Sequence, residues 1–364
     1  MSTANERLLR EVITHAVYLN RYSNHVIQRI VKQLNKMDKE LLAEITEALE
    51  RLPAKSFTVQ RLERLLKSVE ATNKLALELV YAELRTELRG FAAYEAGYQL
   101  ELFRSLLPPV IVTEIGVAKV NVEKLFSATL SKPMQGRLLK QWAKSIGIKR
   151  LERVKDAIVI GYSEGRTTDE IVRQLRGSRA KGYRDGVLNG TRNDIASVVD
   201  TAIGHVAADT RQAFYERNKS LIKAIKWVST LDTRTTPDCF IRDGLLYRPI
   251  TFKPINHNYK WLQGAGKLHF RCRSTETPIT KSYRELGIDI DEVPPSERAS
   301  MDGQVPADMT FRQWFDEQTA ARQNQVLGPR RAKMYRDQGL SLDKFFSDKG
   351  DFLTLEDLKE IGIN

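Results

Sequence analysis

The chain has 364 residues, of which 41% are hydrophobic, and its 58 Lys and Arg against 46 Asp and Glu give a net charge of +12. This composition can bury the cores of about two domains and excludes an intrinsically disordered protein. No stretch approaches the roughly 18 apolar residues of a membrane-spanning helix, so no such segment is expected. Residues 1–10 carry charges with no apolar run behind them, so we also expect no signal peptide.

Two further compositional features bear on the partners and the compartment. The chain contains only two cysteines, which indicates a protein assembled in a reducing compartment. Its basic balance favours a polyanionic partner, nucleic acid above all.

Residues 1–107 are predicted to form an N-terminal helical domain. Apolar residues recur at helical spacing from Leu8 to Leu34 and again from Leu41 to Leu52. From 54 to 107 there is no proline and only two glycines, which favours another long helical stretch. A proline pair ends it, and we expect a hinge or linker over 108–133. The apolar stripes indicate the core of a helical bundle, and the long helices are candidates for docking onto a partner.

Residues 134–285 are predicted to form a second domain that is helical at first and ends in a small antiparallel β module. Thr167 and Glu170 form a capping box, and Gly177 ends the helix that it begins. An alternating pattern at 224–228 predicts the first strand. The expected helices span 135–145, 149–162, Thr167 to Gly177, and 194–218.

The most basic segment lies inside this domain. Residues 132–192 contain 15 Lys and Arg against 6 Asp and Glu. At its end, residues 177–193 carry four glycines and Tyr183, which predicts a flexible basic loop that either binds phosphates or is simply solvated. No recognition-helix or finger pattern is present, so binding would be independent of nucleic-acid sequence. The candidate nucleic-acid-binding residues are Arg176, Arg179, Lys181, Arg184 and Arg192.

Residues 286–364 are predicted to form a turn-rich tail with short helices. One helix is expected to open at Gly328-Pro329 and to run through Asp337, closed by Gly339, and another to begin at the capping box of Thr354 and Asp357. The expected fold class is therefore α+β and mostly α, with long N-terminal helices and a small antiparallel β module.

The residues with the clearest chemistry lie between Trp227 and Ser274. Cys239 and Cys272 are both there, and His269 precedes Cys272 by three residues. Thiolates and imidazole are ligands that suit a tetrahedral zinc ion, with Asp232 or water as the fourth ligand. The same residues could instead form an unliganded buried cluster or a Cys239–Cys272 disulfide. In each case the cluster fastens a small β module that has little core of its own.

This region resembles the signature of the Mu F-type phage minor head proteins, a head morphogenesis domain. The signature residues are Trp227, Asp232, Cys239, His269 and Cys272, and the resemblance covers about 150–280. Members of that family often carry a third cysteine where this chain has Ser274, so one possible ligand is missing here.

The resemblance implies a virion protein without catalytic turnover. It would lie in the head interior or at the portal after assembly in the host cytoplasm, as a late protein acting in head assembly or viral DNA ejection. Its partners would be the portal protein, the capsid interior and packaged double-stranded DNA. Two alternatives remain open. One is a sequence-independent nucleic-acid-binding protein outside the virion. The other is an enzyme with Cys239 as nucleophile, His269 as base and Asp232 orienting the ring.

Overall fold

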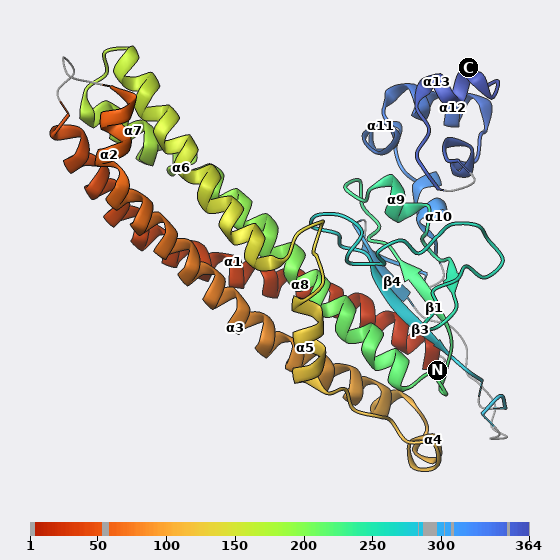
Figure 1. Cartoon of the computed structure of the whole chain (residues 1–364). Coiled ribbons are helices and arrows are strands. Elements are labelled where there is room, and N and C mark those ends of the chain that lie inside the picture. The colour runs from red at the N-terminus through yellow and green to blue at the C-terminus, as the bar shows by residue number, and fades with distance from the viewer. Residues whose placement is uncertain are drawn as a thin grey trace. The chain divides into compact units, whose positions relative to one another are not determined.

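The structure is a computed structural model that describes residues 4–52, 58–282, 284–286, 297–301, 303–306, 309–347 and 350–363. Its fold is α+β and mostly α, as the sequence predicts (Figure 1). The strands are β1 (Ile222–Val228), β2 (Leu246–Tyr247), β3 (Thr275–Thr280), β4 (Glu297–Ser300) and β5 (Gly303–Pro306). The helices are α1 (Ala4–Glu50), α2 (Val59–Leu65), α3 (Lys67–Leu106), α4 (Pro109–Glu114), α5 (Val122–Leu130), α6 (Leu139–Ser163), α7 (Thr168–Arg176), α8 (Asn189–Arg217), α9 (Pro237–Phe240), α10 (Phe311–Asp316), α11 (Ala320–Leu327), α12 (Pro329–Gln338) and α13 (Leu355–Glu360), with 3-10 turns η2 (Arg179–Lys181) and η3 (Leu342–Phe345).

The chain divides into two compact units, and both are discontinuous in sequence. Unit 1 comprises Met1–Asn20, Ala92–Phe126 and Gly204–Asn364, and unit 2 comprises Arg21–Phe91 and Ser127–Ile203. Helices α1, α3 and α8 each contribute residues to both units.

These units differ from the sequence-based ranges of 1–107, 108–133, 134–285 and 286–364. The reason is physical: breaks in the hydrophobic pattern mark where elements end, but they do not say which elements pack together. The stretch expected to be a hinge also contains two short helices, α4 and α5.

Unit 2 is built from helices that share one apolar core. Residues one helical turn apart on α1, such as Leu41 and Ile45, are fully buried, as is Ile158 of α6. Helix α6 is continuous where the sequence predicts two helices, over 135–145 and 149–162. The expected break falls at Gly147, which is buried against α3 and whose carbonyl accepts a hydrogen bond from Asn73 at 2.9 Å.

The middle of unit 1 is a three-stranded antiparallel sheet in the order β2-β1-β3. The sequence places β1 two residues late, at 224–228 instead of 222–228. Trp227 of β1 is fully buried, and its ring meets Trp261 edge to face, with 5.1 Å between centroids. Leu8 of α1 and Phe103 of α3 belong to the same core cluster, so N-terminal residues help to cover the sheet module.

Helices α10–α13, drawn in blue in Figure 1, form a second apolar cluster in unit 1 around Phe311, Trp314 and Phe345. This cluster includes Phe240 of α9. Asp243 joins the two parts because its carboxylate accepts from the backbone N–H of Ser229 at 2.6 Å and of Phe311 at 2.7 Å. The predicted capping box of Thr354 and Asp357 is confirmed, and α12 ends at Gln338, one residue later than predicted, with Gly339 as its cap. Within the described residues, none of the helices is long and apolar enough to cross a membrane.

Candidate metal centre

The three predicted soft ligands come from two short segments beside the sheet. Cys239 lies on α9, the single helical turn after β1, where Pro237 occupies the first turn and needs no N–H partner. His269 and Cys272 lie in the turn that leads into β3, and this turn is closed by a 3.2 Å hydrogen bond from the Cys272 N–H to the His269 carbonyl. The structure therefore brings together residues that are about thirty positions apart.

The ligand atoms converge closely. The Cys239 Sγ lies 3.7 Å from the Cys272 Sγ and 3.3 Å from the His269 Nε2. A tetrahedral zinc ion with Zn–S bonds near 2.3 Å separates two sulfur ligands by about 3.8 Å, so the two thiols already stand at the spacing such an ion requires. The same spacing also suits a hydrogen bond between the two thiols of an unliganded cluster.

Neighbouring groups orient the histidine toward the sulfur atoms. The His269 Nδ1 lies 2.8 Å from the backbone carbonyl of Phe270, which can only accept, so Nδ1 carries the proton of the neutral ring. The lone pair of Nε2 is then directed at the thiols and at the Thr236 hydroxyl, 3.0 Å away. This arrangement is typical of histidines that bind metals.

The charges of the cluster favour a thiolate at one of the two sulfurs. A hydrogen bond from Cys239, and then the neighbouring His269, hold the pKa of Cys272 well below its ordinary value. The interaction with Cys272, together with burial, raises the pKa of Cys239. The pKa of His269 is raised by the same Cys272 sulfur. Metal binding would therefore displace protons from this cluster, and its affinity would fall at low pH.

Asp232, the predicted fourth ligand, has a different set of partners. Both of its carboxylate oxygens are bound by the guanidinium of Arg273, at 2.8 Å for the Oδ1 contact. Its Oδ1 also accepts from the Arg234 N–H at 3.0 Å and from the Thr235 hydroxyl at 3.2 Å. Asp232 thus ties the turn before α9 to the segment before β3, and it is not among the three residues whose ligand atoms converge.

A small cavity adjoins Cys239 and His269 and supplies oxygen atoms for a fourth position. Its volume of about 20 Å³ is enough for one water molecule. Ser274 and Thr236 both line it. A zinc ion held by Cys239, His269 and Cys272 could therefore complete its tetrahedron with water or a hydroxyl group.

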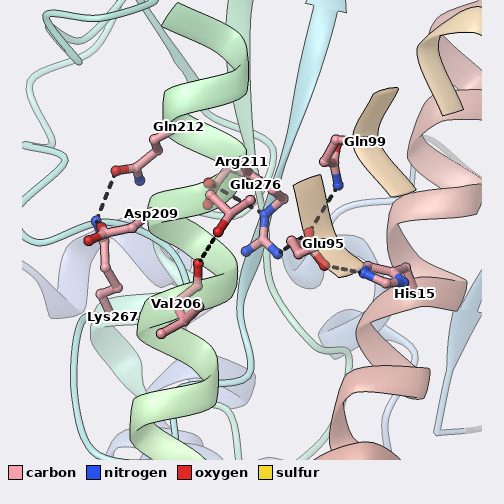
Figure 2. Close-up of polar contacts among 10 residues, drawn as sticks. His15, Glu95, Gln99, Val206, Asp209, Arg211, Gln212, Lys267 and Glu276 are labelled. Atoms are coloured by element: carbon pink, nitrogen blue, oxygen red, sulfur yellow. Dashed lines mark hydrogen bonds and ion pairs between the residues drawn. The ribbon is translucent and has the colours of Figure 1, made fainter. Parts of the chain in front are cut away.

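The loop that carries His269 is fastened to α8. Lys267 donates to the Asp209 carboxylate at 2.7 Å and to the Gln212 side chain at 2.8 Å (Figure 2). One turn earlier on α8, a Cβ at Gly204 would lie only 2.9 Å from the Gly266 carbonyl, so glycine is needed for this close approach. A glycine inside a predicted helix is the sequence signal that could have indicated this contact.

A buried charge network, absent from the sequence-based predictions, anchors β3 beside the cluster. Figure 2 shows Arg211 of α8 between two carboxylates, with its Nη1 3.5 Å from Glu95 of α3 and its Nε 3.6 Å from Glu276 of β3. Glu95 also lies 2.5 Å from the Nε2 of His15 and accepts from Gln99 at 3.1 Å. Both carboxylates are fully buried. We name these residues, His15, Glu95, Gln99, Arg211 and Glu276, the Arg211 network.

The pKa values of the two carboxylates of this network shift in opposite directions. Burial raises the pKa of Glu276, whose single cationic neighbour in ion-pair range is Arg211 among the described residues. Burial opposes ionisation of Glu95 too, but the His15 and Arg211 contacts outweigh it and hold the pKa of Glu95 below its ordinary value. The network therefore depends on the one guanidinium that both carboxylates share.

His205 of α8 is another buried titratable residue that is absent from the sequence-based predictions. Its Nε2 is buried and has no hydrogen-bond partner within the described part of the chain. Burial, together with the positive charge of Lys267, lowers the pKa of His205 to about 4. The ring is therefore neutral in the folded protein at neutral pH.

This depressed pKa predicts a specific acid sensitivity. The unfolded chain takes up a proton on His205 near pH 6.5, whereas the folded chain resists protonation until about pH 4, so stability is lost as the pH falls through this window. One pKa unit corresponds to about 1.4 kcal/mol, so from about pH 7 to about pH 4.5 the wild type should lose roughly 2–3 kcal/mol more than His205→Leu. Denaturant unfolding of both proteins at both pH values measures this; parallel losses would assign the acid sensitivity to other groups.

The basic candidates fall into two groups in unit 2. Arg176, Arg179, Lys181 and Arg184 are exposed around η2, where Asp185 closes the turn by accepting from the N–H and hydroxyl of Ser178, both at 2.8 Å. The other candidate, Arg192, binds the protein itself: it donates to Asn35 at 2.8 Å and to Asp38 at 3.1 Å. The first four are here called the basic turn.

The chain has also been compared with known proteins. Searches with protein-family models, with curated proteins and with solved structures find no match to it.

Proposed function

We propose that this chain is a bacteriophage minor head protein of the Mu F type, in which Cys239, His269 and Cys272 hold a structural zinc ion. The observation that carries the proposal is the convergence of these three signature residues at distances that suit a tetrahedral ion. The resemblance of the signature supplies the assignment to a phage head, with the portal and packaged DNA as partners.

A structural role for the cluster is supported by what it connects. Cys239 belongs to the turn after β1, and Cys272 to the turn before β3, so an ion between them would join the two ends of the segment that contains β2. That segment has little regular structure and contains the two residues of β2, so a local cross-link is physically useful there.

Two contacts favour this role over a Cys–His–Asp catalytic triad. The Nδ1 of His269, which a triad carboxylate would bind, faces the Phe270 carbonyl, and Asp232 is engaged by Arg273. Cys239 is only 2% exposed, and its pKa is raised by Cys272 and by burial, which makes its thiol a poor nucleophile.

The zinc proposal predicts one metal ion per chain and a shared effect of its ligands. Removal of zinc by a chelator should lower the melting temperature, since a ligand at a hundred times its Kd stabilises a fold by about 2.7 kcal/mol. Cys239→Ser, His269→Gln and Cys272→Ser should each abolish zinc binding. A double variant should lower the melting temperature little more than a single one does, because all three residues serve one site.

The measurement is elemental analysis with thermal unfolding, and Ser274→Cys is the matched gain-of-ligand variant. This change should strengthen zinc retention against a chelator, because Ser274 lines the cavity beside Cys239 and His269. A metal-free protein whose melting temperature is unchanged in the three ligand variants would contradict both the metal and the packed-cluster interpretations.

The basic turn is the proposed contact with packaged DNA. Because its side chains are exposed and present no base-reading helix, binding should be equal for two unrelated duplexes and should weaken steeply with salt. Neutralising all four residues to Gln should reduce the slope of log K against log salt by up to about 0.9 per lost phosphate contact. Gel-shift titrations at several salt concentrations measure both quantities.

The control for DNA binding removes four positive charges from unit 1 instead of from the basic turn. Arg330, Lys333, Lys344 and Lys359 are exposed in unit 1, and changing these four to Gln should leave the slope nearly unchanged. Equal effects of the two quadruple variants would assign DNA binding to overall charge and not to the basic turn.

The phage assignment itself is tested on particles. Purified full and empty heads of the source phage, analysed by quantitative mass spectrometry, should contain this protein at a fixed ratio to the portal protein. A nonstructural phage protein made at the same time serves as the control. Absence from both kinds of particle, with the portal present, would overturn the assignment and leave the alternative of a nucleic-acid-binding protein outside the virion.

A further inference from the structure

The two thiols of this chain face one another although 33 positions separate them. Cys239 and Cys272 are the only cysteines among the 364 residues, and both are free, with 3.7 Å between their sulfur atoms. A disulfide needs the sulfurs at about 2.05 Å, so the two atoms must approach one another by roughly 1.7 Å. The two thiols are therefore each other's nearest possible partners for a disulfide within this chain.

Access to the pair is unequal. Cys239 is buried on α9, whereas Cys272 is partly exposed in the turn that leads into β3. Cys272 is also flanked in the sequence by Arg271 and Arg273, and cationic side chains attract anionic thiol reagents. A reagent from solution therefore reacts with Cys272 first, and the buried Cys239 sulfur lies 3.7 Å from the Cys272 sulfur.

We propose that Cys239 and Cys272 are a modification site, which a low-molecular-weight disulfide of the glutathione class converts into an intramolecular disulfide. We further propose that this disulfide and the zinc ion are mutually exclusive states of one site; this second part rests on the proposed metal site. Both sulfurs are ligands in one state and are bonded to each other in the other.

The reaction balances in two exchange steps. The Cys272 thiolate attacks one sulfur of oxidised glutathione, forming a mixed disulfide and releasing one glutathione thiolate. Cys239, after losing its proton to water or buffer, attacks the Cys272 sulfur and releases the second glutathione thiolate. The two protein thiols are oxidised by two electrons, and one glutathione disulfide is reduced to two thiols.

The two states provide a different cross-link in reducing and in oxidising surroundings. In a reducing cell the thiols are available to a metal, and after release into oxidising surroundings the disulfide makes the same connection between α9 and the turn before β3. The module would then keep its cross-link where zinc is scarce.

The experiment uses the full chain, reduced and then either stripped of metal or loaded with zinc, and exposed to oxidised glutathione. Samples are quenched with an alkylating reagent, and intact mass and peptide mapping count the thiols and locate the link. The metal-free protein should lose both thiols and yield a Cys239–Cys272 peptide pair that dithiothreitol reverses. The zinc-loaded protein should keep both thiols at the same exposure.

Two variants report on the order of the steps. Cys239→Ser should retain a stable glutathione adduct at Cys272, and Cys272→Ser should react several-fold more slowly at Cys239. Two free thiols, a lasting glutathione adduct or disulfide-linked dimers in the metal-free wild type would overturn the disulfide. Equal oxidation with and without zinc would overturn mutual exclusion. If elemental analysis finds no bound metal, the metal proposal fails while the thiol count still decides the disulfide.

Discussion

Arg211→Leu is expected to lower the free energy of unfolding by about 3–5 kcal/mol, because it leaves two buried carboxylates without their shared cation. The guanidinium lies within 3.6 Å of Glu276 and 3.5 Å of Glu95, and all three side chains are excluded from solvent. Glu276 has no other ion-pair partner among the described residues, so it would have to become protonated or unfold the region around β3. Urea unfolding at neutral pH measures the loss.

An exposed arginine provides the control. Arg104 of α3 forms an ion pair with Glu101 at 3.3 Å, but its side chain is 42% exposed and that of Glu101 is 72% exposed. Arg104→Leu should therefore change the free energy of unfolding by less than about 1 kcal/mol. Adding Glu95→Gln and Glu276→Gln to Arg211→Leu should recover part of the loss. If the triple variant is as unstable as the single one, packing and not charge explains the effect.

Asp38→Ala should destabilise unit 2 by a comparable amount, about 3–5 kcal/mol. The Asp38 carboxylate is bound by Arg150, which is only 1% exposed, and by Arg192 at 3.1 Å. Two guanidinium atoms of Arg150 already lack hydrogen-bond partners within the described structure, so removing Asp38 leaves a buried cation with nothing to neutralise it. Thermal or urea unfolding followed by circular dichroism measures the change.

Asp194 is the matched control in the same unit. It forms an ion pair with Arg153 at 3.0 Å, but both side chains are more than one-third exposed. Asp194→Ala should consequently cost under about 1 kcal/mol. Similar losses in the two variants would show that burial does not set the strength of these ion pairs.

The parts of the fold that the sequence predicted are those fixed by neighbouring residues. The capping box of Thr167 and Glu170 begins α7, and Gly177 ends it with the positive φ that glycine tolerates. Packing partners are not local: in unit 2 the buried pair of Asp38 on α1 and Arg150 on α6 joins residues 112 positions apart, and the periodicity of each helix is the same whichever partner it has. Helix α6 runs through Gly147, whose carbonyl accepts a hydrogen bond from Asn73 of α3, and the local sequence does not indicate this contact.

In the candidate site, too, some residues could be predicted from the sequence and others could not. Cys239, His269 and Cys272 could be predicted to meet because soft ligands are rare in this chain and lie in a single short region. Proximity in sequence also predicts Asp232 as a ligand, but its carboxylate binds Arg273, a partner that spacing does not distinguish from other nearby arginines. His15, Glu95 and Arg211 carry no local signal, since charged residues on helices are usually solvated.

The contacts between α1 and β3 limit where this chain can be divided into parts that fold alone. The Asn5 side chain accepts from both the N–H and the hydroxyl of Thr280, at 2.8 and 2.9 Å, and the Glu95–His15 pair adjoins Arg211. A gene fragment encoding only residues 134–285 would lack Asn5, His15 and Glu95, and with them the apolar cover from Leu8 and Phe103. A genetic exchange that transferred only residues 134–285 would therefore leave β3 and its core without these contacts, so the transferred segment should be less stable than it is in the full chain.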